Sequence, residues 1–269
     1  MPTLTEIGIH AQRFVNPIVA DTFTKVYCTR LGKSRKLSDK LKFAKDYNID
    51  FRKTRKCSRN DTLETCLEKF PTLNDFFARE LKPEFLKIES RRKGDLVSPA
   101  ESMARRISAV KDGEFSIKGA NYTMEKLLRT KQAPLQATVL VFRLAPEHYH
   151  RIHSPCDSTI KNIRSVGGHY LSVNPILLDR NPILQENYRK IITFTNGMIM
   201  VAVGASCVGT VDLSVHRGDH VKKGQDLGCF KFGGSCIVLI LPEPMKLVDC
   251  KLNVKERFIR VGSYVGHIV

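Results

Sequence analysis

The chain has 269 residues, of which 42% are hydrophobic, and its 44 Lys and Arg against 27 Asp and Glu give a formal net charge of +17. This length supports one sizeable core and leaves no room for a second catalytic domain. The longest apolar runs, such as Ile237 to Leu241, fall far short of the roughly twenty residues that span a bilayer, so we expect no transmembrane helix. The opening residues also lack the features of a secretory signal.

The first 95 residues are predicted to form a helical segment. Asn16 can cap a helix that has Pro17 at its first position. The apolar residues that follow at helical spacing form a stripe, which we expect to pack on the core, with lipid contact as the alternative. They are Ile18, Val19, Phe23, Val26 and Tyr27.

Most of the excess positive charge lies between Lys25 and Arg59, a stretch that contains thirteen basic residues and three acidic ones. The stretch lacks interleaved aromatic platforms and any motif that reads bases, so we expect no nucleic-acid partner. An anionic membrane surface is the predicted partner, and a merely solvated basic face is the alternative.

A further helix is expected after Thr72, which forms a capping-box-like start with Asp75. We predict that Pro83 marks its end. Its inward-facing residues, expected to serve as scaffold, are Leu73, Phe76, Phe77 and Leu81.

From residue 96 onward, short apolar runs alternate with Gly and Pro, which is typical of a predominantly β domain. A single short helix is expected over 124–129. The main runs are Val139 to Phe142, Ile191 to Phe194, Met198 to Val203 and Ile237 to Leu241. We therefore predict an α+β fold, with the helical segment followed by a barrel-like or sandwich-like β domain over 96–269.

The eight cysteines are scattered, with no Cys-x-x-Cys pair and no metal-ligand spacing to histidine. We predict reduced structural thiols rather than disulfides or zinc, and we assign no metal. The cysteines are Cys28, Cys57, Cys66, Cys156, Cys207, Cys229, Cys236 and Cys250.

Two consecutive glycines, Gly233 and Gly234, stand between two apolar runs and precede Ser235. Glycine permits φ values closed to other residues, so the chain can bend here. The Ser235 hydroxyl could then face the Gly234 carbonyl and attack its own preceding peptide bond. An ordinary hairpin is the alternative.

Three histidines occur within six residues, between Pro146 and Pro155. In an extended segment His148 and His150 share one face and His153 lies on the other. Histidine titrates near neutrality, so the cluster is a candidate source of a general base.

The stretch 215–225 is similar to the hairpin of biotinyl and lipoyl carrier domains. A carrier also needs a lysine presented on a tight turn at a matching distance, and the sequence has none there. We interpret the stretch as part of the β architecture.

Six segments resemble, in the same order, the family of pyruvoyl-dependent phosphatidylserine decarboxylases, which are made as proenzymes and cut themselves at a Gly–Ser bond. The segments are 70–83, 98–101, 149–153, 172–175, 203–205 and 232–235. The lead-in at 43–50 is similar to the eukaryotic endomembrane branch of the family rather than to its mitochondrial or bacterial branches.

The resemblance implies that Ser235 attacks the Gly234 carbonyl, with His153 as the base and Glu101 as the acid that orients the imidazole. An N-to-O acyl shift, elimination and loss of ammonia would leave a covalent pyruvoyl group at position 235. Residues 1–234 would become the β subunit and 235–269 the α subunit of one catalytic domain.

The implied activity is the conversion of phosphatidylserine to phosphatidylethanolamine and carbon dioxide, through a Schiff base between the pyruvoyl group and the substrate amine. His150 is implied as the proton donor. The resemblance further implies a homodimer, docked peripherally on the cytosolic face of endomembranes. The residues expected to contact the substrate are Tyr149, Ser172, Asn174 and Ile176.

Two positions depart from the family pattern. The family has Asp-Gly where this chain has Glu101-Ser102, and Thr or Ser where it has Cys236. Because glutamate moves the carboxylate by about one bond length, we expect slow self-cleavage rather than none. The alternatives are a lipid-binding relative that does not cut itself and a pyruvoyl-dependent decarboxylase of a soluble amino acid.

Overall fold

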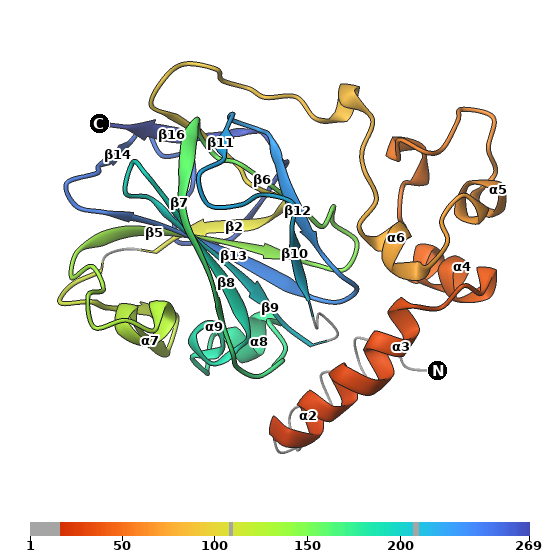
Figure 1. The fold of residues 1–269 in the computed structure, drawn as a ribbon, viewed down its shortest axis with the longest axis horizontal. Helices are drawn as coiled ribbons and strands as arrows, with labels where there is room; N and C mark the ends of the chain where they lie inside the picture. The colour runs from red at the N-terminus through yellow and green to blue at the C-terminus, as the bar shows by residue number, and fades with distance from the viewer. Residues whose placement is uncertain (1–16, 108–109, 207–209) are drawn as a thin grey trace.

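The computed structural model describes residues 17–107, 110–206 and 210–269 (Figure 1). Helices occupy the first part of the chain, and the predicted cap Asn16 lies outside the described residues. The helical elements of this part are α2 (Pro17–Phe23), η1 (Thr24–Cys28), α3 (Thr29–Gly32), α4 (Leu37–Asp46), η2 (Phe51–Lys53), α5 (Leu63–Glu68), α6 (Leu73–Phe77) and η3 (Pro83–Phe85).

Strands dominate the rest of the chain, which confirms the predicted α+β class. Three short helices interrupt them: α7 (Met124–Leu128), α8 (Pro175–Leu178) and α9 (Ile183–Glu186). The strands are β1 (Asp95–Val97), β2 (Ser102–Arg106), β3 (Glu114–Ile117), β4 (Ala120–Thr123), β5 (Ala137–Leu144), β6 (Arg151–His153), β7 (Ser158–Val166), β8 (Arg189–Phe194), β9 (Ile199–Gly204), β10 (Val211–Leu213), β11 (His220–Val221), β12 (Asp226–Phe230), β13 (Ser235–Pro242), β14 (Leu247–Val248), β15 (Arg257–Ile259) and β16 (Tyr264–Ile268).

The largest sheet has eight strands in the order β11-β7-β8-β9-β13-β5-β2-β15. Two three-stranded sheets, β1-β16-β14 and β10-β12-β6, share a core with it. Within the described residues this large sheet does not close on itself, so the sandwich-like alternative describes the fold better than the barrel. The carrier-like stretch supplies β11, which pairs with β7 at one sheet edge.

Strand β13 lies in the middle of the large sheet and is paired along its length with β5 and β9. Successive side chains of a strand point to opposite faces of its sheet. Ile237 accordingly packs in the core shared with the three-stranded sheets, whereas Cys236 and Val238 pack in a second core, which includes residues of α7, α8 and α9.

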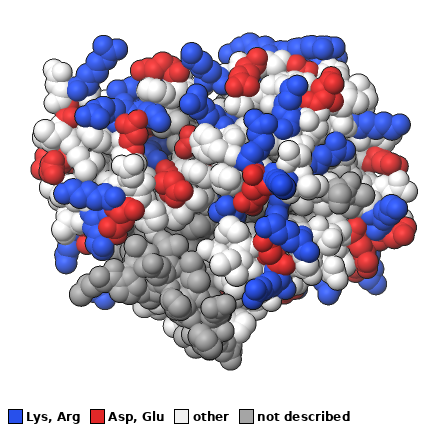
Figure 2. Space-filling view, turned by 180° about the vertical axis from the view of Figure 1, so that it is seen from behind, with Lys and Arg blue, Asp and Glu red and all other residues white. Residues whose placement is uncertain are grey.

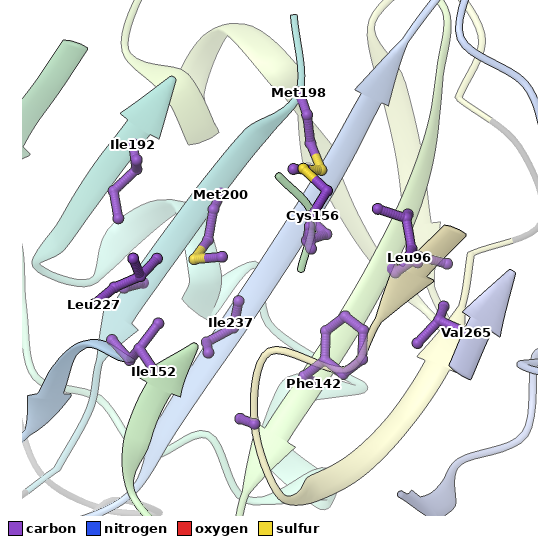
Figure 3. Packing of buried hydrophobic residues seen from close by; sticks show 14 of the residues in the cluster. Leu96, Phe142, Ile152, Cys156, Ile192, Met198, Met200, Leu227, Ile237 and Val265 are labelled. Carbon is purple, nitrogen blue, oxygen red and sulfur yellow. The ribbon is translucent and has the colours of Figure 1, made fainter. Parts of the chain in front are cut away.

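Figure 3 shows the first of these cores. Ile237, Met200 and Phe142 belong to the large sheet, and Leu227 and Ile152 come from β12 and β6. Apolar burial of this kind contributes roughly 25 cal/mol for each Å² removed from water. This packing holds the sheet β10-β12-β6 against the large sheet.

The helical segment has a core of its own, and that core reaches into the β part of the chain. Phe43 of α4 and Phe76 and Phe77 of α6 are buried together with Phe232. Phe232 precedes β13 by three residues. The helices therefore pack directly beside the Gly-Gly-Ser stretch.

The start of α6 confirms the predicted capping box. Thr72 accepts a hydrogen bond from the Asp75 backbone N–H, and the Asp75 carboxylate accepts one from the Thr72 N–H at 2.9 Å. The predicted end of the helix was wrong, because α6 stops at Phe77. The chain then becomes extended, and Leu81 forms a β-bridge with Thr54.

The prediction that the N-terminal apolar stripe packs on the core was wrong for three of its five residues, whereas Phe23 is half-buried and the Val19 side chain lies outside the described part of the structure. Ile18 is 67% exposed, Val26 64% and Tyr27 48%. Helix α2 is instead held by a polar residue, because Asp21 accepts hydrogen bonds from the backbone N–H of Tyr170 and from His169 Nδ1. These contacts leave apolar side chains of the stripe facing outward.

The prediction that all cysteines are reduced was also wrong, because Cys57 and Cys66 form a disulfide. Their Cα atoms lie 5.1 Å apart, within the range that a disulfide needs. The free thiols among the described residues are Cys156, Cys229, Cys236 and Cys250.

Arg189 of β8 lies buried and donates to the backbone carbonyls of Lys126, Leu127 and Asn187 at 2.6 to 2.7 Å. Burial lowers the pKa of its guanidinium to about 10, so it remains charged at neutral pH. The Arg189→Leu variant would leave these carbonyls without their donor. We expect urea unfolding to show a loss of about 3 kcal/mol, because each buried unsatisfied group costs roughly 1–3 kcal/mol.

The matched control is Arg164→Leu, since the exposed Arg164 donates to the neighbouring Leu128 carbonyl. This variant should lose less than about 1 kcal/mol. Equal losses for the two variants would contradict the structural role of Arg189.

Candidate active site

Ser235 is the first residue of β13 and is fully buried. It pairs with Leu144 of β5 on one side and Gly204 of β9 on the other. Its Oγ has no hydrogen-bond partner in the part of the chain that the structure describes. A buried hydroxyl without a partner is rare in proteins and marks a candidate reactive group.

The loop before Ser235 has the bend that the two glycines predict. Gly233 has a φ of 134°, in the region that favours glycine. Three backbone N–H groups of the loop are held. Lys231 donates to the Thr210 carbonyl at 3.1 Å and Gly234 to the Ser206 carbonyl at 3.2 Å. Phe232 donates to the Asn74 side chain at 2.7 Å.

His150 is fully buried beside this loop. Its Nδ1 lies 2.9 Å from the His148 carbonyl, which fixes the tautomer with the proton on Nδ1. The other ring nitrogen, Nε2, has no partner among the described residues. Burial lowers the pKa of His150 well below its usual value, so Nε2 is a free acceptor at neutral pH.

His153 is also buried, but both of its ring nitrogens are occupied. Nδ1 lies 2.8 Å from the Gly224 carbonyl, and Nε2 lies 3.0 Å from the Tyr149 hydroxyl. Burial lowers the pKa of His153 as well. In the pairing of β6 with β12 it stands opposite Asp226.

Glu101 contacts Tyr149, which belongs to the segment 148–153 that carries the three histidines (the histidine segment). Its Oε1 accepts a hydrogen bond from the Tyr149 backbone N–H at 3.2 Å. Tyr149 therefore bonds to Glu101 through its backbone and to His153 through its hydroxyl. The buried Arg79 adds a second contact to this segment, because its guanidinium donates to the Glu147 carbonyl at 3.2 Å.

Strand register decides which of these groups lies toward the loop. The Phe230 N–H donates to the His150 carbonyl at the end of β12, where the Gly-Gly-Ser loop begins. His153 lies three residues further from that end. Ring contacts agree, since the His150 ring centroid lies 4.0 Å from that of Phe77, which in turn lies 5.5 Å from Phe232.

Strand alternation places Ser235 on the same face of β13 as Ile237, which packs in the core shared with the three-stranded sheets. The His150 ring contacts Phe77, which belongs to the core of the helical segment. The Cys236 side chain points to the opposite face of β13, where burial raises the pKa of its thiol to about 12.

A cavity of about 320 Å³ adjoins the loop and is lined by Gly233 and Gly234. Two expected substrate contacts, Ser172 and Asn174, also line it. A second cavity, of about 610 Å³, is lined by Tyr149 together with Glu101. The two cavities share Tyr47 and Glu147 as lining residues.

The fourth expected contact, Ile176, is 54% exposed and lines neither cavity. The sequence interpretation overlooked Asn74 and Phe77 as parts of the site, because α6 was treated as scaffold. Their position in a segment of the family resemblance, 70–83, was a signal that could have pointed to them.

Comparison with known proteins identifies the class to which this site belongs. The family model for phosphatidylserine decarboxylase matches residues 73–267, which contain β13 and the histidine segment. The chain belongs to the phosphatidylserine decarboxylase family.

Relatives from yeasts and bacteria agree with this assignment. Phosphatidylserine decarboxylase proenzyme 2 of Saccharomyces cerevisiae is 36% identical over 221 residues, which cover 76% of this chain and 19% of the yeast protein. The phosphatidylserine decarboxylase proenzyme of Clostridium perfringens strain SM101 is 31% identical over 242 residues, covering 84% of this chain and 78% of that protein. The chain thus spans about a fifth of the yeast relative and most of the bacterial one.

The burial of His150 predicts a pH-dependent stability. A histidine in the unfolded chain titrates near 6.5, whereas the pKa of folded His150 lies well below that. On acidification the unfolded state takes up a proton that the folded state does not, so the unfolding free energy falls. Between about pH 7 and about pH 5.5, a Ser235→Ala protein should lose about 1 kcal/mol more than a Ser235→Ala, His150→Gln protein in urea unfolding.

Both proteins lack the Ser235 hydroxyl, so the self-cleavage that the sequence predicts would not divide either chain. Burial also lowers the pKa values of His148 and His153. Both histidines are present in the two proteins, so their contributions to the pH dependence of the unfolding free energy cancel in the comparison. An identical pH dependence in the two proteins would show that His150 is not held neutral by burial.

Proposed function

We propose that this chain is a phosphatidylserine decarboxylase that makes its own pyruvoyl group by cutting the bond between Gly234 and Ser235. The observation that carries the proposal is the buried Ser235 hydroxyl, which has no partner in the described part of the chain and lies two residues after Gly233, a glycine at positive φ. Membership of the family supports the same reaction. A lipid-binding protein that never cuts itself would have no use for this arrangement.

The surroundings of Ser235 fit a pyruvoyl group. Conversion of the serine removes a hydroxyl that bonds to nothing described, so the loss of this hydroxyl breaks no hydrogen bond. The loop cavity lies next to Gly234, which leaves space for a substrate at the new end of the chain. When present, this group supplies an electrophilic carbonyl for an amine and an electron sink for the loss of carbon dioxide.

For the self-cleavage we propose Ser235 as the nucleophile and His153 as its base, with Glu101 holding the histidine in place. Their link through Tyr149 supports a shared role, since Tyr149 bonds to both. To act, His153 must exchange its Tyr149 contact for the Ser235 hydroxyl. Ser235 Oγ then adds to the Gly234 carbonyl carbon, and the bond from that carbon to the Ser235 nitrogen breaks.

For the decarboxylation we propose that His150 handles the proton. Its Nε2 is a free acceptor in a water-poor layer, so it can take a proton from the substrate ammonium and return it to carbon after carbon dioxide leaves. The ring is held by the His148 carbonyl and by Phe77. Ser172 and Asn174 line the cavity and are proposed to hold the serine headgroup.

A lipid substrate fits the walls of the loop cavity. Phe23 and Tyr27 line it from α2 and η1. Ile18 and Val26 of the same two elements are exposed, and we propose that an acyl chain enters the cavity along these apolar side chains. This observation favours phosphatidylserine over a soluble amino acid.

The basic surface supports docking on an anionic membrane. Figure 2 shows Lys and Arg over much of one face, with acidic residues between them. Lys40 does not belong to this surface, because it is buried and donates to the Leu67 and Phe70 carbonyls. No helix among the described residues is long and apolar enough to cross a bilayer. We propose peripheral attachment to the cytosolic face of endomembranes, and the homodimer stays a prediction.

Self-cleavage is tested by the denatured mass of freshly purified protein. The wild-type chain of 30.4 kDa should separate into residues 1–234 and 235–269, whereas Ser235→Ala should stay whole because it lacks the nucleophile. His153→Gln should also stay whole, and His150→Gln should be cut but fail to release carbon dioxide from phosphatidylserine. A wild-type chain that stays whole would contradict the proposal. An uncut His150→Gln beside a cut His153→Gln would exchange the two roles.

Substrate class and membrane docking are tested together on the cut protein. Carbon dioxide release should be fast from phosphatidylserine vesicles and absent from free serine. Val26→Asp should lower vesicle binding about tenfold, because a charge on the apolar face opposes insertion. Turnover of short-chain phosphatidylserine below its micelle concentration should be unaffected. Equal turnover of free serine would favour a soluble substrate.

A further inference from the structure

The loop that carries the cleavage site is held by one side chain from outside the β part of the chain. Of the three loop N–H groups with known acceptors, two bond to the backbone at Thr210 and Ser206. The third, on Phe232, bonds to Asn74 Oδ1 at 2.7 Å. Among the described residues Asn74 is therefore the side chain that fixes a peptide two residues before Gly234.

Asn74 lies on the same short helix as a residue that contacts His150. In α6, Asn74 and Phe77 are three residues apart and so share a face. The Phe77 ring contacts the His150 ring at 4.0 Å between centroids, with the two planes tilted by 35°. The start of the helix is fixed by the Thr72 and Asp75 capping box. One helical turn thus touches both the cleavage loop and the histidine segment.

The lack of a side chain at Gly32 makes room for the Asn74 amide. A Cβ atom at Gly32, the last residue of α3, would lie 2.6 Å from Asn74 Nδ2 and 3.0 Å from its Oδ1. Such distances are too short for two unbonded atoms, so a larger residue must push the Asn74 amide away. The absence of a side chain at Gly32 leaves the space in which Asn74 reaches the Phe232 N–H.

We propose that Asn74 is a positioning residue for self-cleavage, which it supports by holding the Phe232 peptide and thereby the approach of Ser235 Oγ to the Gly234 carbonyl. This inference rests on the proposed self-cleavage. Attack needs the reacting atoms within about 3–3.5 Å, and a misplacement of about 1 Å can cost a hundredfold in rate. Without its acceptor, the Phe232 N–H loses this restraint, and Gly233 places little restraint on the turn that follows.

The test is a time course of the uncut fraction, measured by denatured mass after synthesis of the full chain in a cell-free system. Asn74→Leu keeps the size and removes the acceptor, and we expect cleavage to slow at least tenfold. Asn74→Asp keeps an oxygen at the same place and should restore most of the rate. A purely structural role for Asn74 would not produce this difference between two variants of similar shape.

Gly32→Ala tests the same contact without touching the loop or Asn74. Alanine favours a helix more than glycine does, so the backbone should not suffer. The added methyl group should nevertheless slow cleavage by displacing the Asn74 amide. The matched control is Gly167→Ala, where nothing lies within 4 Å of the added atom and cleavage should keep the wild-type rate.

The outcomes separate this inference from the proposed function. A wild-type chain that never cuts itself would overturn both. A cut wild type with Asn74→Leu and Gly32→Ala cut at the same rate would overturn only the role of Asn74. If Asn74→Leu loses its circular-dichroism signal and fails to fold, Gly32→Ala decides, and wild-type cleavage of that folded variant counts against the inference.

Discussion

The middle of a β-sheet keeps the nucleophile that we propose for self-cleavage buried and without a hydrogen-bond partner among the described residues. Ser235 opens β13 between β5 and β9, where the ladder fixes the backbone on both sides. Its hydroxyl faces a core rather than water, and no described group competes for it. The paired strand begins at Ser235. Gly233 lies two residues before it and has a positive φ, in the region that favours glycine.

The helical segment completes this arrangement. Phe43 and Phe77 pack on Phe232, and Asn74 bonds to its backbone. The loop is therefore held between a β-sheet and a helical core that lies far away in the sequence. This arrangement would make the proposed self-cleavage sensitive to the docking of the helices. It also places the apolar face of α2 and η1 beside the cavity that a lipid would enter.

Much of the fold follows from local sequence patterns. The runs that became β5, β8, β9 and β13 were readable as short apolar stretches between Gly and Pro residues, and the capping box at Thr72 from two side chains. Tertiary contacts overrode other local signals. The polar contacts of Asp21 turned an apolar stripe outward, and proximity in space paired Cys57 with Cys66. No pattern of spacing encodes either outcome.

Sequence could nominate residues for the candidate site but not the contacts between them. The family resemblance pointed to Ser235, His150, His153 and Glu101, whose types suit the proposed chemistry. Sequence could not reveal that Tyr149 would stand between Glu101 and His153, or that His150 would adjoin the loop. Those facts follow from the register of β6 against β12, which depends on the packing of the whole domain.

The mass of the small fragment, measured under denaturing conditions, tests the central claim most directly. If Ser235 has become a pyruvoyl group, the fragment 235–269 should be lighter by one ammonia molecule than the same peptide beginning with serine. It should also resist N-terminal sequencing, because no amino group remains. A fragment that begins with an intact serine would show cleavage by ordinary hydrolysis, and this result would contradict the account.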